Sequence, residues 1–185
     1  STPPRVLAFD TFGTVTDWLG GISAAVASSV PGVDAVEFAR QWRARYSPAI
    51  ARVEAGEIGW RGLDDLQSDT LGEVAAQFGV AIGADRAAHL VHAWREIPGW
   101  PDSARGLARL RRRFTVCALS NGSVALLTEM AKRNGFDWDF IGGSDLWHHY
   151  KPAPQTYLGL TGLMEARPHE VMTVSYTHLT LPTKA

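Results

Sequence analysis

The sequence predicts an α/β protein in which a Rossmann-like parallel sheet forms the core and carries an inserted all-helical cap. Three short apolar runs support this fold class, at residues 6–9, 114–119 and 171–174. Each run is continuous rather than alternating, which is typical of a parallel strand buried on both faces. Helical patterns separate the runs, and alternation of strands with helices indicates a parallel sheet with crossover helices.

The first expected strand, residues 6–9, ends at Asp10 and is followed by a turn that contains Gly13. Residues 17–98 show no convincing strand and three amphipathic helical patterns, which Pro98-Gly99 closes. The apolar positions of these patterns are Phe38, Trp42, Tyr46 and Ile50, then Leu63, Leu66, Val74 and Phe78, and then Ala87, Leu90, Val91 and Trp94. We therefore expect residues 17–98 to form a helical cap inserted after the first strand.

The core is expected to comprise residues 1–16 and 99–174. Ser123 is placed to cap the helix after the second strand, because a serine hydroxyl accepts hydrogen bonds from the N–H groups of a first helical turn. Residues 140–142 are a further candidate strand. A helix before the second strand is indicated by Ala104, Leu107 and Leu110.

Composition and charge limit the class of protein. Lys and Arg number 18 against 19 Asp and Glu, so the formal charge of −1 gives no basic field for nucleic acid. No apolar run approaches the roughly 20 residues of a membrane span, and no leader pattern opens the chain. The lone Cys117 excludes an intramolecular disulfide, and its mid-strand position indicates a buried apolar residue. We expect a cytoplasmic protein that binds neither nucleic acid nor membranes.

Polar residues follow the predicted strands, at the sheet edge where ligands of open parallel sheets bind. Asp10 follows the first strand, and Lys151 follows the candidate strand at 140–142. Ser120 and Asn121 follow the second strand. Taken singly, these residues also fit turn residues or, for Lys151, a solvated lysine. Their convergence favours a site that combines a carboxylate, a hydroxyl, an amide and an ammonium group.

Three segments in the right order and spacing resemble the first three motifs of the haloacid dehalogenase superfamily. They are FDTFGT at 9–14, LSNGS at 119–123 and YKP at 150–152. Within the superfamily, the chain resembles the L-2-haloacid dehalogenases of type II over roughly residues 5–174. The similarity extends into the predicted cap through QWRARY at 41–46. The resemblance implies a hydrolase that acts on a small 2-haloacid and uses no metal or other cofactor.

The resemblance also implies a mechanism. Asp10 displaces the halide of a short (S)-2-haloacid and becomes an ester, which water hydrolyses to the (R)-2-hydroxy acid. Lys151 holds Asp10 through a charge-assisted hydrogen bond. The further implied roles are binding of the substrate carboxylate by Thr14 and Ser120, binding of the halide by Arg43 and Asn121, and a polar network around the site that includes Tyr157.

Other interpretations stay open for several of these residues. Thr14 can cap the turn after the first strand. Arg43 lies among other arginines, which favours a solvated helix face, and Tyr157 can pack against the sheet as an ordinary helix residue. His148 and His149 are adjacent, so their side chains point apart, and no ligand partner has a suitable spacing. We therefore expect surface histidines rather than a metal site.

Phe12 separates two mechanisms within the superfamily. Phosphatase members carry a second aspartate two residues after the nucleophile, which protonates the leaving alcohol, whereas a halide leaves without a proton. Here that position is Phe12, which supplies apolar packing beside the substrate. The sequence therefore ranks a phosphatase third among the candidate functions.

The C-terminal residues depart from the family pattern. Thr177 and Thr180 stand where the family has an asparagine and an aspartate, and that aspartate helps to activate the hydrolytic water. We hypothesise that residues 175–185 are not native sequence but a frame-shifted or read-through end of a truncated gene. The second candidate function is therefore an inactive or non-catalytic member that binds a small carboxylate or anion. With either function, assembly of the chain into a homodimer stays an open alternative.

Overall fold

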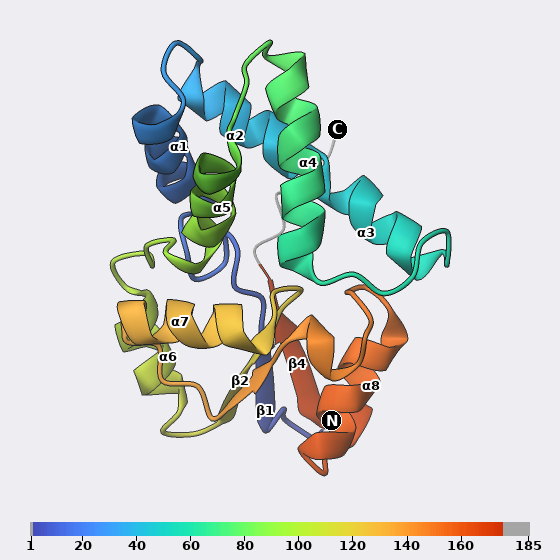
Figure 1. Cartoon of the computed structure of the whole chain (residues 1–185). Helices are drawn as coiled ribbons and strands as arrows, with labels where there is room; N and C mark the ends of the chain where they lie inside the picture. The colour runs from blue at the N-terminus through green and yellow to red at the C-terminus, as the bar shows by residue number, and fades with distance from the viewer. Residues whose placement is uncertain (1, 176–185) are drawn as a thin grey trace, which may run out of the picture.

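The computed structural model describes residues 2–175, in which four parallel strands form one sheet of order β3-β2-β1-β4 (Figure 1). The strands are β1 (Val6–Phe9), β2 (Thr115–Leu119), β3 (Phe140–Gly142) and β4 (Val171–Val174). At the start of β1, Val6 pairs with Thr115 of β2 and with Val171 of β4. The predicted α/β fold with a parallel sheet is confirmed. Of the hypothesised non-native end, residues 176–185 lie outside the described residues.

Helices cover both faces of the sheet, namely α6 (Ser103–Leu110), α7 (Val124–Asn134) and α8 (Pro154–Leu163). Successive strand residues point to opposite faces. Leu7 accordingly packs in the large apolar cluster that includes Leu107 of α6 and Leu126 of α7. Val6 packs in a second cluster with Leu160 of α8. The strands are thus buried on both sides, which explains why their sequences are continuous apolar runs.

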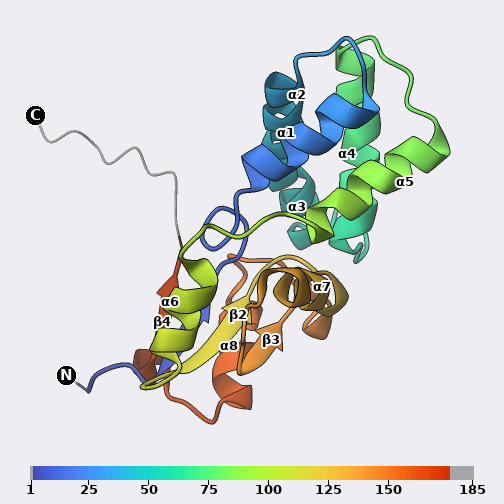
Figure 2. The same cartoon turned by 90° about the vertical axis from the view of Figure 1, so that its left-hand side faces the viewer.

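The cap expected from the sequence is a group of helices between β1 and β2, which we call the cap helices. They are α1 (Trp18–Ser29), α2 (Ala35–Ala44), α3 (Tyr46–Glu54), α4 (Leu63–Gln77) and α5 (Ala84–His92), and a short 3-10 helix, η1, follows at Ala93–Arg95. The cap helices form a layer of their own beside the sheet and its flanking helices (Figure 2). We retain the boundaries at residues 17 and 98 as a proposal for the division into cap and core.

Two backbone hydrogen bonds join the segments that lead into and out of the cap helices. The N–H of Asp17 donates to the carbonyl of Pro98 at 2.8 Å, and the N–H of Trp100 donates to the carbonyl of Val15 at 3.1 Å.

The predicted helix N-cap at Ser123 is confirmed, because its Oγ accepts from the N–H of Leu126 in α7 at 3.0 Å. Within residues 2–175, no helix has both the length and the apolar character that crossing a membrane requires.

The apolar pattern from Phe38 to Ile50 is divided between two helices, so the single helix that the spacing predicts is wrong. Helix α2 ends at Ala44 and α3 begins at Tyr46. Pro48 lies in the first turn of α3, where its missing N–H costs little. In one continuous helix the proline ring would clash with the carbonyl of Ala44, four residues earlier. The chain therefore turns at the junction, and Tyr46 starts a new helix.

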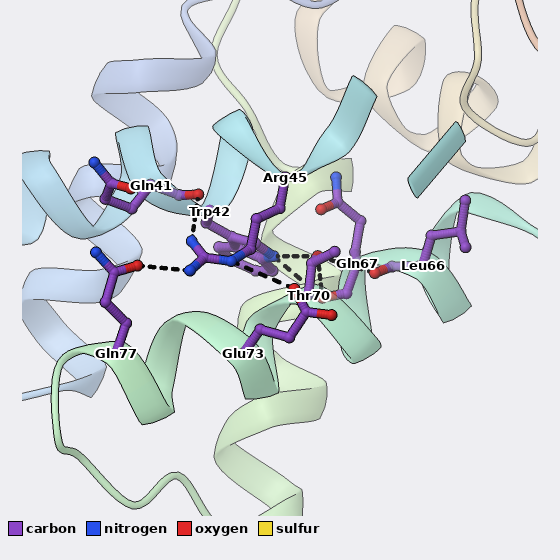
Figure 3. Close-up of polar contacts among 8 residues, drawn as sticks. All are labelled: Gln41, Trp42, Arg45, Leu66, Gln67, Thr70, Glu73 and Gln77. Atoms are coloured by element: carbon purple, nitrogen blue, oxygen red, sulfur yellow. Dashed lines mark hydrogen bonds and ion pairs between the residues drawn. The ribbon is translucent and has the colours of Figure 1, made fainter. Parts of the chain in front are cut away.

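Trp42 fixes α2 against α4 (Figure 3). Its side chain is fully buried, and its Nε1–H lies 3.1 Å from both the carbonyl of Gln67 and Oγ1 of Thr70. The Arg45 guanidinium makes further contacts with Gln41, Glu73 and Gln77. Because successive helix residues lie about 100° apart, this anchoring fixes the direction in which the neighbouring Arg43 projects.

We expect Trp42→Phe to lower the free energy of unfolding by about 1–3 kcal/mol. The phenyl ring keeps most of the apolar contact, but the buried Gln67 carbonyl and Thr70 hydroxyl lose their indole donor. Urea denaturation followed by circular dichroism measures the change. A loss below about 0.5 kcal/mol would contradict the assignment of Trp42 as an anchor of α2.

Candidate active site

Asp10 and Lys151, between which the family resemblance implies a charge-assisted hydrogen bond, form an ion pair at the carboxyl end of the sheet. Asp10 directly follows β1, and its N–H donates to the carbonyl of Val174 at 2.8 Å. Its Oδ1 accepts from the N–H of Thr11 at 2.9 Å and lies 3.2 Å from Nζ of Lys151. The two side chains are 23% and 18% exposed, so the pair is sheltered but still reachable by a small molecule.

Asn121, two residues after β2, links this pair to the cap helices. Its Oδ1 accepts from the N–H of Lys151 at 2.7 Å, and its Nδ2 donates to the carbonyl of Lys151 at 3.3 Å. The same Nδ2 donates to the hydroxyl of Tyr46 at 2.7 Å. The buried amide therefore fixes the backbone of Lys151, a role beyond that of a simple turn residue.

Tyr46 lies at the centre of the site, although its spacing in the sequence predicts only a core-facing position. Its hydroxyl accepts a hydrogen bond from Nδ2 of Asn121, and its ring centroid lies 3.9 Å from the guanidinium carbon of Arg43. Burial raises the pKa of the Tyr46 phenol, the Arg43 charge and the Asn121 hydrogen bond oppose the rise, and the Asp10 carboxylate adds to it. Tyr46 is therefore a neutral phenol that connects α3 to the sheet edge.

Arg43 projects into a cluster of aromatic rings. Besides the Tyr46 ring, the ring centroids of Phe12, Trp18 and Trp94 lie 5.4, 5.7 and 5.8 Å from the guanidinium carbon of Arg43. Its Nη1 is buried and has no hydrogen-bond partner within residues 2–175. The expectation of a solvated helix face is wrong for Arg43. A buried guanidinium N–H without an acceptor is unfavourable, and an anion bound beside it would satisfy it.

The loop after β1 carries the other two candidates near Asp10. Phe12 is buried and packs edge-on against Trp94, with ring centroids 5.8 Å apart. Gly13 has a φ of 84°, a left-handed conformation that favours glycine. Thr14 is half-buried on the same loop. The position two residues after Asp10 is therefore filled by apolar packing and offers no carboxylate.

Ser120 and Tyr157 approach the site from the sheet and from α8. Ser120 is buried, and its hydroxyl forms a 2.8 Å hydrogen bond with the hydroxyl of Thr11, a contact that the sequence pattern does not predict. Tyr157 is half-buried, and burial raises the pKa of its phenol, to which the charge of Asp10 adds. Tyr157 therefore lies within electrostatic reach of Asp10.

We assign no role in the chemistry to Cys117 or to the two adjacent histidines. Cys117 is fully buried in β2, and burial raises the pKa of its thiol to about 11, so a nucleophilic thiolate does not form near neutral pH. His148 is exposed and stacks on Trp60. His149 is half-buried at the surface, with 37% of its side chain exposed, and its Nδ1 lies 3.1 Å from Oε2 of Glu54.

A pocket of about 470 Å³ opens between α3 and the loop that carries Lys151. Its lining is mainly apolar and includes Ile50, Ala51 and Pro152, together with Tyr46. Lys151 and Glu54 also line the pocket, so it adjoins the Lys151 side of the ion pair. The residues expected near the hydrolytic water, Thr177 and Thr180, lie outside the described residues.

The carboxylate after the first strand of the parallel sheet is paired to a lysine and lies beneath a layer of helices. This arrangement is typical of the active site of an α/β enzyme. The family model for haloacid dehalogenase-like hydrolases matches residues 4–175, and the chain belongs to this family. It is therefore a hydrolase by family. A comparison with curated proteins gave no match.

Solved structures identify the branch of the family to which the chain belongs. The chain is 39% identical to a defluorinating L-2-haloacid dehalogenase, with a TM-score of 0.89 over 93% of this chain and 73% of that one. A second L-2-haloacid dehalogenase is 35% identical, with a TM-score of 0.88 over 93% and 76% of the two chains. Both place the chain in the L-2-haloacid dehalogenase branch. The enzyme from Xanthobacter autotrophicus with chloropropionic acid covalently bound shares the fold, at 21% identity, a TM-score of 0.83 and coverage of 92% and 69%.

Proposed function

We propose that this chain dehalogenates short (S)-2-haloacids by hydrolysis and produces (R)-2-hydroxy acids. The observation that carries the proposal is the sheltered Asp10 carboxylate, held 3.2 Å from the Lys151 ammonium at the sheet edge. Two solved structures at 39% and 35% identity are L-2-haloacid dehalogenases, which supports the substrate class.

In the first step, an oxygen of Asp10 attacks C2 of the haloacid. The new C–O bond forms as the carbon–halogen bond breaks, and the halide leaves with the bonding electron pair, so C2 is inverted. The contacts from Thr11 and Lys151 both engage Oδ1 of Asp10, and we therefore assign Oδ2 as the attacking oxygen. Lys151 thus orients the nucleophile without blocking it.

In the second step, water attacks the side-chain carbonyl carbon of the Asp10 ester. The bond between that carbon and the former Oδ2, now bound to C2, breaks. One proton of the water goes to the departing oxygen and the other to solvent, so the 2-hydroxy acid is released and Asp10 is regenerated with an oxygen from water. Because this bond is not at C2, the inverted configuration is kept. Neither step requires a metal or another cofactor, since the halide leaves without a proton and the substrate carries a single carboxylate.

The surrounding residues supply the two anion contacts of the reaction. We assign Arg43 to the departing halide, because its buried Nη1 lacks a partner and stabilises charge where it develops. We also assign Asn121 to the halide. Its Nδ2 makes a long 3.3 Å contact with the Lys151 carbonyl, and it gives up this contact to donate to the halide. We assign Thr14 and Ser120 to the substrate carboxylate. Phe12 provides apolar packing, and it gives no acid for a phosphatase reaction.

The test is halide release from racemic 2-chloropropionate, with chiral chromatography of the products. We expect consumption of the (S) enantiomer alone and formation of (R)-lactate. Fluoroacetate belongs in the same panel, because one relative is a defluorinating enzyme. Binding of 2-chloropropionate without halide release would favour the non-catalytic alternative. Hydrolysis of p-nitrophenyl phosphate with magnesium, without dehalogenation, would favour a phosphatase.

We expect Arg43→Lys to lower kcat/KM for dehalogenation about tenfold. A lysine keeps the charge, but its ammonium cannot lie flat against the rings of Tyr46 and Phe12 or present a planar set of N–H donors. Arg45→Lys is the matched control, because Arg45 contacts Gln77 on the side of α4 (Figure 3). Equal activity of wild type and Arg43→Lys would contradict the assigned role.

A further inference from the structure

The loop that carries Lys151 is held by a carboxylate of the cap helices, that of Glu54. Glu54 is the last residue of α3, and its side chain is 22% exposed. Its Oε1 accepts from the backbone N–H of Tyr150 at 2.6 Å, and its Oε2 lies 3.1 Å from Nδ1 of His149. Both oxygens of one side chain therefore bind the two residues that precede Lys151.

The segment after α3 encloses the same loop. Tyr150 is fully buried, its hydroxyl donates to the carbonyl of Arg61 at 2.5 Å, and its ring stacks on Trp60 at 4.8 Å. Trp60 also stacks on His148 at 5.0 Å, with only 7° between the ring planes. Residues 148–150 are thus packed against α3 through the Glu54 carboxylate, and against the segment after α3 through the Arg61 carbonyl and the Trp60 indole ring.

Consecutive N–H groups of the loop are bound from opposite sides. The N–H of Tyr150 donates to Glu54 of the cap, and the N–H of Lys151 donates to Asn121 of the sheet edge at 2.7 Å. His148 has a φ of 50°, an uncommon conformation for a residue other than glycine, so its surroundings must stabilise it. The position of the Lys151 ammonium therefore depends on contacts from both layers.

We propose that Glu54 is a positioning residue for dehalogenation, and the proposal rests on the function proposed above. By binding residues 149 and 150, Glu54 keeps the Lys151 ammonium on Asp10 and holds α3 against the loop. Its two oxygens are engaged by the loop, so Glu54 acts through Lys151 and does not contact the reacting atoms.

The test compares Glu54→Ala, Glu54→Gln and Glu57→Ala. We expect Glu54→Ala to lower kcat about tenfold and to change KM less than twofold, because a displaced ammonium weakens the chemical step more than binding. Glu54→Gln should restore kcat to within about twofold of wild type, since the amide oxygen accepts from Tyr150 and its NH₂ donates to neutral His149. Glu57 is the matched control, because its exposed carboxylate pairs with Arg52.

Hydrogen exchange of residues 147–153 gives a second measurement. Glu54→Ala should speed exchange there and leave β2 unchanged, whereas Glu57→Ala should change neither. If Glu54→Ala fails to fold, Glu54→Asp replaces it, because its shorter side chain cannot reach the loop, and the same loss of kcat is expected.

Wild-type kcat in the Glu54→Ala variant, or an equal loss of kcat in Glu54→Gln, would overturn the positioning role. If the wild-type chain releases no halide, the proposed function fails separately. In that case, unchanged exchange of residues 147–153 in Glu54→Ala would overturn the contact itself, and faster exchange would support it.

Discussion

Asp10→Asn should lower halide release at least about 10³-fold and leave the fold intact. The amide has nearly the shape of the carboxylate, and its oxygen can still accept from the N–H of Thr11. It lacks the negative charge that makes a carboxylate oxygen a nucleophile towards C2, so the ester does not form. Initial rates of chloride release from (S)-2-chloropropionate measure the loss, and thermal unfolding confirms that the protein is folded.

The matched control for this variant lies on the same segment of chain. Asp17 is the N-cap of α1, and its Oδ1 accepts from the N–H of Gly20 at 2.9 Å. Asparagine is as good an N-cap as aspartate, so Asp17→Asn should keep both stability and activity. If Asp10→Ala turned over at the wild-type rate, Asp10 could not be the nucleophile.

The ester on Asp10 gives an independent observation of the same step. When the wild-type reaction is stopped with acid at early times, the peptide that contains Asp10 should carry the mass of the substrate acid without its halogen. Asp10→Asn should carry no such adduct. An adduct on any other peptide would move the nucleophile elsewhere, even if halide release were normal.

The sequence predicts the sheet and the convergence of polar residues at its edge from local patterns, whereas the contact of Lys151 with Asp10 is implied by the family resemblance. Strands covered on both faces must be apolar throughout, and the carboxyl ends of parallel strands necessarily meet at one edge. Asp10, Asn121 and Lys151 each follow a strand, so the topology alone brings them together. The Asp10–Lys151 distance of 3.2 Å and the Asn121 contacts agree with that prediction.

The cap side of the site could not be predicted in the same way. The spacing of Tyr46 suits a core position, and the break at Arg45 that starts a new helix depends on Pro48. The direction of Arg43 depends on the rotation of α2, which the contact of Trp42 with α4 fixes. These features arise from packing between segments far apart in the chain, which a periodic pattern does not encode.

Lys151→Ala should lower kcat about 10²–10³-fold, the second largest effect that we expect. A charge-assisted hydrogen bond contributes about 1.5–3 kcal/mol, which corresponds to about 10–10²-fold in rate. Loss of the orientation of Asp10 adds to this, because Lys151 engages Oδ1 and leaves Oδ2 for attack. The loop itself should keep its path, since Asn121 binds backbone atoms of residue 151 rather than the ammonium.

Added ethylammonium distinguishes the ammonium group from a general disturbance of the site. The pocket of about 470 Å³ beside Lys151 can admit this ion, so it should restore part of the rate of Lys151→Ala and leave the rate of Asp10→Asn unchanged. Lys132→Ala, at an exposed position of α7, should keep wild-type kcat without added amine. A Lys151→Ala variant within twofold of wild-type kcat would mean that Thr11 alone orients the Asp10 carboxylate, since its N–H makes the other contact with Oδ1.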